Sequence, residues 1–147
     1  LVLPCWYLLG ILDRAVATTA QYVQERKQFG KPLAAFQSVQ FQLTDAEVER
    51  TGLEELAKYA LWSFATRQDD ALVDALALRL AAIKAGDLAI RICHQLHGAI
   101  GFCDETTLSW ISRYSRPVRT LPLSITATRD ELVARAGHRG LTGLFSA

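Results

Sequence analysis

The sequence has no methionine, few cysteines and no long apolar run. The missing methionine, absent even at position 1, indicates a fragment or a processed product. No apolar run reaches the roughly 18 residues of a membrane-spanning helix, and the apolar opening lacks the basic region of a signal peptide. Cys5, Cys93 and Cys103 have neither metal-ligand nor redox spacing, which predicts reduced thiols in a cytoplasmic protein, at least two of them buried.

An excess of charge of either sign is also missing. The 147 residues include 16 Lys and Arg against 15 Asp and Glu, so nothing favours nucleic acid as a partner. Half of the residues are hydrophobic and 21% are charged, which is typical of one globular domain with a real core. There is no Gly-x-Ser-x-Gly segment and no cysteine with a plausible base, so no serine or cysteine nucleophile is indicated.

Strand-like alternation is absent, whereas helical spacing recurs along the chain. Apolar residues at this spacing predict helices over residues 3–26, 37–67, 71–96, 104–114 and 124–136. An aspartate in the turn 68–70 can cap the third helix, and Thr128-x-x-Glu131 resembles a capping box that would start the last helix later. Two prolines mark 115–122 as a connection. The sequence therefore predicts an all-α fold: a four-helix bundle, mostly antiparallel, with an additional short helix.

The third predicted helix carries two polar groupings. His94 and His97 are spaced i,i+3, but no third metal ligand is evident, so we interpret them as a partly exposed pair at a helix end and predict no metal site. Asp87 and Arg91 are spaced i,i+4, and a solvated ion pair is a better interpretation than a catalytic dyad.

The stretch between the first two predicted helices is dense in unusual features. Arg26 offers a planar fork of donors suited to phosphate. Gly30 and Pro32 break the helix, and Phe29 and Phe36 are apolar anchors that can pin the connection to a core. Two interpretations fit these features: a rigid inter-helix loop that holds an anion, or a helix stop with a surface arginine.

Two blocks of sequence carry a family resemblance. The block Arg26-Lys-Gln-Phe-Gly-Lys-Pro-Leu, followed by Phe36-Gln, resembles the Arg-x-x-Phe-Gly-x-Pro-Leu…Phe-Gln segment of acyl-CoA dehydrogenases. The block Gln95-Leu-His-Gly-Ala-Ile-Gly-Phe102 resembles that family's Gln-x-x-Gly-Gly-x-Gly-Tyr/Phe loop. The resemblance covers only the family's C-terminal helical domain. It implies that 1–147 is a single helical-bundle domain of a larger flavoprotein, without the N-terminal helical and middle β domains.

The resemblance implies FAD as the cofactor and assigns roles in the first block. Arg26 matches the arginine that contacts the FAD pyrophosphate, Phe29 matches the aromatic residue that packs beside the cofactor, and Gln37 matches a polar contact. An arginine neutralises phosphate charge, which agrees with this assignment.

The second block matches a loop that meets the FAD of a neighbouring subunit. Gln95, Gly98 and Ala99 are the matching residues. Glycines let backbone N–H groups approach phosphates closely. Ala99 stands where the family has the second glycine of a pair, so its methyl group is either tolerated or crowds the nucleotide.

The catalytic base of the family has no counterpart in this chain. Counting from Gln95, the position of the family's glutamate falls on Pro122, which cannot accept a proton. Asp130 and Glu131 lie more than a helical turn further on. Other family members carry the base on the first helix, at a position just upstream of Leu1. We therefore expect no catalytic residue here.

The resemblance implies a C-terminal FAD-contacting and oligomerisation domain of an acyl-CoA dehydrogenase-like flavoprotein that oxidises an acyl-CoA thioester at the α,β bond. The isolated chain is expected to be inactive. The partners implied are the acyl-CoA substrate of the parent protein and further subunits, identical or different, in a dimer or tetramer. One alternative is a non-catalytic subunit or assembly module of a hetero-oligomeric acyl-CoA dehydrogenase. The other is an unrelated helical bundle.

Overall fold

The computed structural model describes residues 1–66 and 71–137, and the side chains of 136 and 137 are not among them. Its helices are α1 (Val2–Glu25), α2 (Gln37–Thr66), α3 (Ala71–His97), α4 (Thr107–Thr120) and α5 (Ile125–Gly137). Between them lie the strands β1 (Lys27–Gln28) and β2 (Lys31–Pro32) and the short 3-10 helices η1 (Leu33–Ala35) and η2 (Gly98–Phe102). The predicted all-α fold is confirmed.

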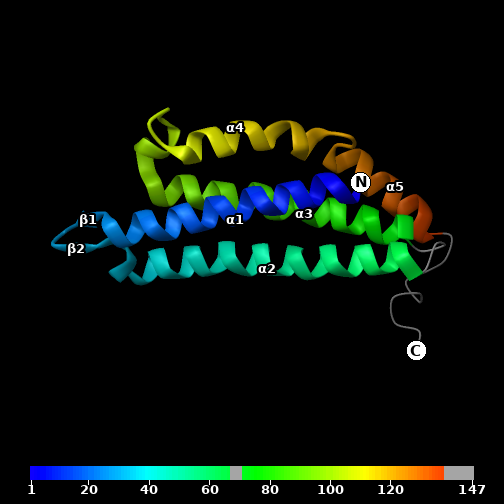
Figure 1. Ribbon diagram of the computed structural model, residues 1–147, viewed down its shortest axis with the longest axis horizontal. Helices are drawn as coiled ribbons and strands as arrows, with labels where there is room; N and C mark the ends of the chain where they lie inside the picture. The colour runs from blue at the N-terminus through cyan, green and yellow to red at the C-terminus, as the bar shows by residue number, and fades with distance from the viewer. Residues whose placement is uncertain (67–70, 138–147) are drawn as a thin grey trace.

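The three longest helices form the body of the bundle. Helices α1, α2 and α3 lie side by side, α4 runs along α1 and α3, and α5 packs on α3 at the far end (Figure 1). Helices that follow one another in sequence run in opposite directions up to α4. Small side chains on α3 allow close packing: a Cβ added at Gly86 would lie 3.2 Å from Leu8 Cδ2 and 3.3 Å from Arg119 Cδ.

The core is built from the apolar stripes that the helical spacing predicts. Its buried residues are contributed mainly by α1, α2 and α3, with Leu108 added by α4. Both Cys5 and Cys93 are buried free thiols, whereas Cys103 is exposed, as predicted for at least two of the three. Within the described residues, no helix is long and apolar enough to cross a membrane.

Helix α4 differs from its prediction at both ends. The acidic pair at 104–105 does not open it, because Asp104 instead accepts a hydrogen bond from Trp110 Nε1 on its backbone oxygen and pairs with Arg113. The helix also continues through Pro117, inside the predicted connection 115–122. Its apolar side still packs on the core at Val118, so burial outweighs the one backbone hydrogen bond that a proline removes.

The capping box predicted at Thr128 is wrong. Thr128 is fully buried inside α5, and its hydroxyl donates to the backbone oxygen of Ser124 at 2.7 Å. Ser124 itself accepts a hydrogen bond from Ala127 N on its Oγ at 3.2 Å, which is the geometry of an N-cap. The aspartate cap predicted in 68–70 lies outside the described residues.

The ion pair predicted between Asp87 and Arg91 is also wrong. Asp87 pairs with Arg119, which reaches it from α4. A partner on a packed neighbouring helix replaces the one on the same helix, because the Arg119 side chain is held against α3 and is only 17% exposed.

A β-hairpin, absent from the prediction, joins α1 to α2. Lys27 pairs with Pro32 and Gln28 with Lys31, around the two-residue turn Phe29-Gly30. Both turn residues have positive φ, 53° and 81°, as in the tight turns that match the twist of a hairpin. This turn places Phe29 at the tip, 92% exposed, so its predicted role as an anchor to the core is wrong.

Candidate functional site

Arg26 is fixed through its backbone and leaves its side chain free. Its N–H donates to Tyr22 O at 2.9 Å, and its carbonyl accepts from Leu33 N at 2.8 Å, so α1 ends there and the hairpin begins. The side chain is exposed and has no ion pair or hydrogen bond within residues 1–66 and 71–137. A guanidinium with all its donors available can bind an anion in a bidentate manner.

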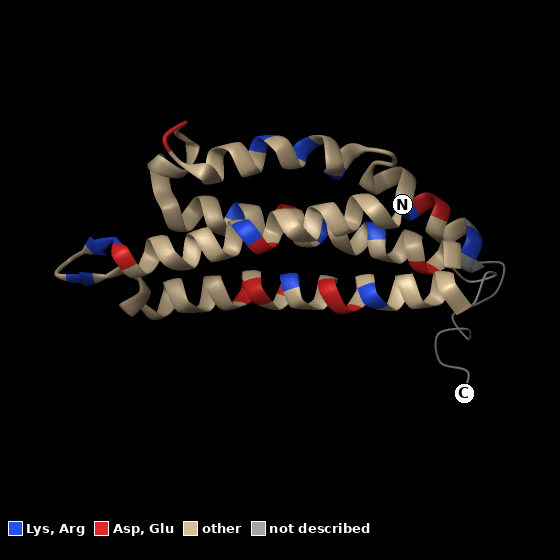
Figure 2. Cartoon of the chain, viewed as in Figure 1, with Lys and Arg blue, Asp and Glu red and all other residues tan. Residues whose placement is uncertain are grey.

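Further positive charge surrounds Arg26. Lys27 and Lys31 lie on the two strands of the hairpin, so basic residues follow both of its sides (Figure 2). Lys31 Nζ lies 4.3 Å from the ring centre of Phe36, which packs edge to face with Phe29. The hairpin therefore combines cations with an exposed aromatic ring. Cations can bind the phosphates of a nucleotide, and an aromatic ring can pack against its ring system.

The second predicted segment begins where α3 ends. Gly98 has a φ of 65°, and a Cβ placed on it would meet nothing within 4 Å, so the backbone there is open to approach. Gln95 and Ala99 are exposed, and the chain itself accommodates the Ala99 methyl group. Gly101, by contrast, is required for packing, since an added Cβ would lie 2.8 Å from His97 Cβ.

Tyr22 connects the two segments. Its ring stacks on His97, with 4.3 Å between the ring centres, and its hydroxyl donates to His97 O at 3.4 Å. Since Tyr22 is also the acceptor for Arg26 N, the hairpin and η2 share one end of the bundle (Figure 1). The sequence did not reveal this role, because nothing in the spacing of Tyr22 separates it from a core residue of α1.

The two histidines are more enclosed than predicted. His97 is buried and its Nδ1 lies 2.8 Å from Cys93 O, while His94 stacks on Phe102. Burial lowers the pKa of His94, and the neighbouring His97 lowers it further. Burial also lowers the pKa of His97, and the hydrogen bond to Cys93 only partly opposes this. The prediction of a partly exposed pair holds for His94, which is half-buried, and is wrong for His97, which is buried. The residues that the structure describes include no cluster suited to a metal ion.

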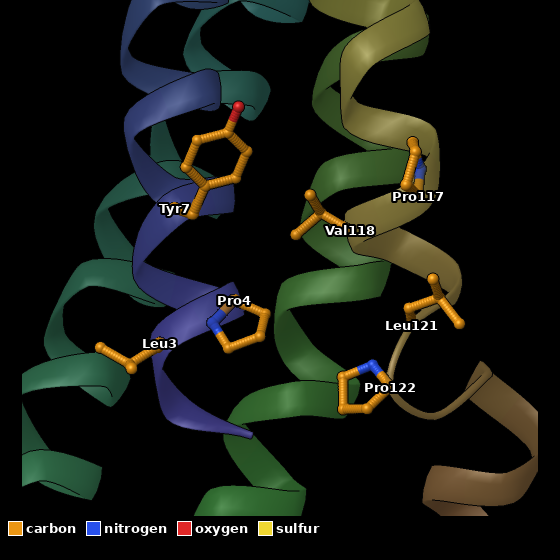
Figure 3. A pocket seen from close by; sticks show the side chains of 7 residues that line it. All are labelled: Leu3, Pro4, Tyr7, Pro117, Val118, Leu121 and Pro122. Atoms are coloured by element: carbon orange, nitrogen blue, oxygen red, sulfur yellow. The ribbon is translucent and has the colours of Figure 1, made fainter.

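An apolar hollow of about 590 Å³ lies toward the other end of the bundle, between the start of α1 and the end of α4 (Figure 3). It is lined by Leu3, Pro4, Tyr7, Pro117, Val118, Leu121 and Pro122. Among the residues that the structure describes, this lining includes no carboxylate. Asp130 and Glu131 lie on α5, where they pair with Arg129 and Arg135.

Behind this hollow lies a buried arginine that the sequence interpretation missed. Arg79 is fully buried on α3 and donates hydrogen bonds to backbone oxygens at the end of α4 and in the connection that follows. One signal could have found it: Arg79 falls in register with the core positions Leu76 and Ile83, where an unpaired charge is not expected.

Comparison with known proteins identifies the family. The family model for the acyl-CoA dehydrogenase C-terminal domain matches residues 2–123. The chain therefore belongs to the acyl-CoA dehydrogenase family, a family of flavoproteins that use FAD, and the part that matches is the C-terminal domain.

Three relatives illustrate the match. The chain is 38% identical over 95 residues to the acyl-CoA dehydrogenase FadE28 of Mycobacterium tuberculosis, which covers 65% of this chain and 28% of FadE28. Its fold is similar to that of the FAD complex of PigA, with a TM-score of 0.81 and 23% identity over 90% of this chain and 34% of PigA. The fold is also similar to that of a chain in the ChsE4-ChsE5 complex of Mycobacterium tuberculosis, with a TM-score of 0.84 and 23% identity over 93% of this chain and 37% of that chain.

The chain thus spans 28% to 37% of these relatives, which are much longer proteins.

Proposed function

We propose that this chain is the C-terminal domain of an acyl-CoA dehydrogenase-like flavoprotein, where it contacts FAD and joins subunits. The carrying observation is Arg26: its backbone is held at the end of α1, its guanidinium has no partner among the described residues, and the hairpin that follows it carries Lys27 and Lys31. When FAD is bound, it supplies the acceptor for the hydride removed from the α,β bond of an acyl-CoA thioester.

The residues of the first segment fit a dinucleotide. Arg26 would hold the pyrophosphate, Phe29 would pack beside the cofactor from the tip of the hairpin, and Gln37 would add a polar contact at the start of α2. All three are exposed, so none has to leave a partner in the core to bind. This fit supports the anion-binding interpretation of the loop over a plain helix stop.

The second segment would serve the FAD of a neighbouring subunit. Gln95, Gly98 and Ala99 lie together at the end of α3, and the open backbone at Gly98 suits the close approach of a phosphate. Sharing of a cofactor between subunits makes oligomerisation part of the function.

Exposed apolar side chains on α2 support an oligomer, with identical or different subunits. They are Phe41, Val48, Leu61, Trp62 and Phe64. Several large apolar side chains exposed along one helix are typical of a surface that packs against another subunit. We place the assembly, a dimer or tetramer, in the cytoplasm, which agrees with three free cysteines.

A second candidate function is a non-catalytic subunit of a hetero-oligomeric acyl-CoA dehydrogenase. By the count from Gln95, Pro122 falls at the position of the family's base, and the described residues that line the hollow include no carboxylate. The fold is similar to that of the ChsE4-ChsE5 complex, whose name describes two different proteins. In either case the base comes from outside residues 1–147, and acyl-CoA is the substrate of the complete protein.

The test is replacement of Arg26 by alanine in the full-length flavoprotein. Loss of a charge-assisted contact to phosphate costs about 1.5–3 kcal/mol, so the dissociation constant of FAD should rise at least about tenfold and less flavin should remain after dialysis. Arg14→Ala, an exposed arginine on α1, is the matched control and should retain flavin. Unchanged flavin content in Arg26→Ala would remove Arg26 from the site. Turnover of acyl-CoA without a partner subunit would exclude the second candidate.

A further inference from the structure

The guanidinium of Arg79 donates its hydrogen bonds to one short segment of backbone. Its Nη1 donates to Val118 O at 2.5 Å, and its Nη2 donates to Leu121 O at 2.8 Å and Leu123 O at 3.0 Å. Its Nε donates to Leu123 O as well, at 3.3 Å. All of these acceptors belong to the last turn of α4 or to the connection to α5. One side chain of α3 therefore holds a segment that lies about 40 residues further along the chain.

The charge of Arg79 is compensated by these carbonyl oxygens. It has no ion pair within the described residues, although its side chain is fully buried. The carbonyls at the C-terminal end of a helix lack partners and carry partial negative charge, so the end of α4 is a suitable environment for a guanidinium. The Cys5 thiol of α1 also faces Arg79, which acts to lower the pKa of Cys5, although burial raises that pKa overall.

The held segment is also a wall of the apolar hollow. Val118 and Leu121 line the hollow, and so does Pro122, which stands between two residues that accept hydrogen bonds from Arg79. Figure 3 shows Val118 and Pro122 on the side of the hollow opposite Pro4 and Tyr7 of α1. The backbone on both sides of Pro122 is thus fixed from the core side, while the side chains are presented to the hollow.

We propose that Arg79 is a positioning residue, which fixes the connection between α4 and α5 so that this segment forms a defined wall for an apolar ligand. The proposal rests on the proposed function only for the nature of that ligand, the acyl part of an acyl-CoA. Loss of Arg79 leaves three backbone oxygens without a donor, and the connection then loses its fixed position while the helices of the core remain packed.

The first measurement is amide hydrogen exchange in the full-length protein. In Arg79→Met, the exchange rate in 118–124 should rise at least about tenfold more than the rates in α1 and α3, which rise only with the loss of global stability. Arg91→Met is the matched control, since Arg91 is an exposed arginine on the same helix, and its exchange pattern should equal that of the unmodified protein. Unchanged exchange in 118–124, or equally faster exchange in every helix, overturns the proposal.

The second measurement separates positioning from mere support of the fold. The dissociation constant of octanoyl-CoA should rise about tenfold in Arg79→Met while flavin content stays constant, and Arg79→Lys, which keeps the charge and three donors, should restore most of the affinity. A parallel loss of flavin and ligand overturns the proposal.

In two cases the exchange measurement alone tests the role of Arg79. If Arg79→Met does not fold, Arg79→Gln, which removes the charge but stays polar, takes its place and must show a rise in exchange that is largest in 118–124; any other pattern overturns the proposal. If the unmodified protein does not bind octanoyl-CoA, the proposed function fails for this ligand, and exchange alone decides the role of Arg79.

Discussion

The two ends of the bundle use their arginines in opposite ways. Arg26 is exposed, and within residues 1–66 and 71–137 only its backbone makes hydrogen bonds. Arg79 is buried, and its side chain holds the backbone of another segment. The exposed guanidinium of Arg26 is available to a ligand. The buried guanidinium of Arg79 is bonded to backbone oxygens inside the protein, where it fixes a segment that lines the apolar hollow. An arginine in this fold therefore indicates a site or a support according to where its donors point.

The largest expected effect is on stability, and it should separate the two arginines. Replacement of Arg79 by methionine removes four hydrogen bonds and leaves buried oxygens unsatisfied, so it should lower the free energy of unfolding by about 3 kcal/mol. Arg26→Ala should change it by less than about 0.5 kcal/mol, because the exposed side chain has no hydrogen bond or ion pair to lose among the residues that the structure describes. Urea unfolding followed by circular dichroism measures both. Equal effects would contradict the comparison.

The next effect concerns the backbone around η2. A methyl group at Gly101 would lie 2.8 Å from His97 Cβ, which cannot rotate away, so Gly101→Ala should cost about 1–3 kcal/mol. Gly52→Ala is the control, since nothing lies within 4 Å of its added Cβ and a helix favours alanine. It should stabilise the chain by up to about 1 kcal/mol. Thermal unfolding of both variants tests the pair, and a neutral Gly101→Ala would show that η2 can move away from His97.

Most of the fold was predictable because apolar residues at helical spacing indicate the long helices in the sequence. The observed ends of α1, α2 and α3 lie within one or two residues of those predicted. The hairpin was missed because each of its strands is two residues long, too short for any alternation. The start of α4 was predicted too early, because acidic residues such as those at 104–105 are typical of the first turn of a helix. Its end was also predicted too early, because the packing of Val118 on the core outweighs the effect of Pro117 on the helix.

The candidate site was predictable only where it is local in sequence. Arg26 and Phe29 lie in one short block, and a block of this kind can be recognised before folding. The role of Arg79 could not be recognised in this way, because its acceptors are backbone oxygens 39 to 44 residues away and any residue type can supply them. The tertiary partner of Asp87 was missed for the same reason.

The histidines near the shared end provide a pH test. The pKa values of His94 and His97 are lowered in the folded state, so the unfolded chain takes up protons first as the pH falls. The free energy of unfolding should therefore be constant above the usual histidine pKa of 6.5 and decrease below it, for example from about pH 7.5 to about pH 5.5. The pKa values of Glu47 and Glu54 are also lowered, but these carboxylates change the free energy of unfolding only as the pH falls below their usual pKa of 4.5.

Thermal unfolding of the chain over this pH range measures the effect. His94→Gln removes one titrating ring and should flatten the dependence. A midpoint that does not change with pH would mean that the two rings accept protons without leaving their stacked positions.

The smallest effect sharpens the comparison at the hairpin, where stability and binding should change in opposite directions. Phe29 has a φ of 53°, a conformation that costs an aromatic residue about 1 kcal/mol but suits asparagine before a glycine. Phe29→Asn should therefore stabilise the chain by about 0.5–1 kcal/mol while lowering flavin retention in the full-length protein, because the ring at the tip is lost. Phe41→Asn removes an exposed aromatic ring from α2 without altering a turn, and it should bring no gain in stability. If Phe29→Asn gains stability and also keeps its flavin, the strained aromatic residue at the tip has no part in the cofactor site, and Arg26 must act without it.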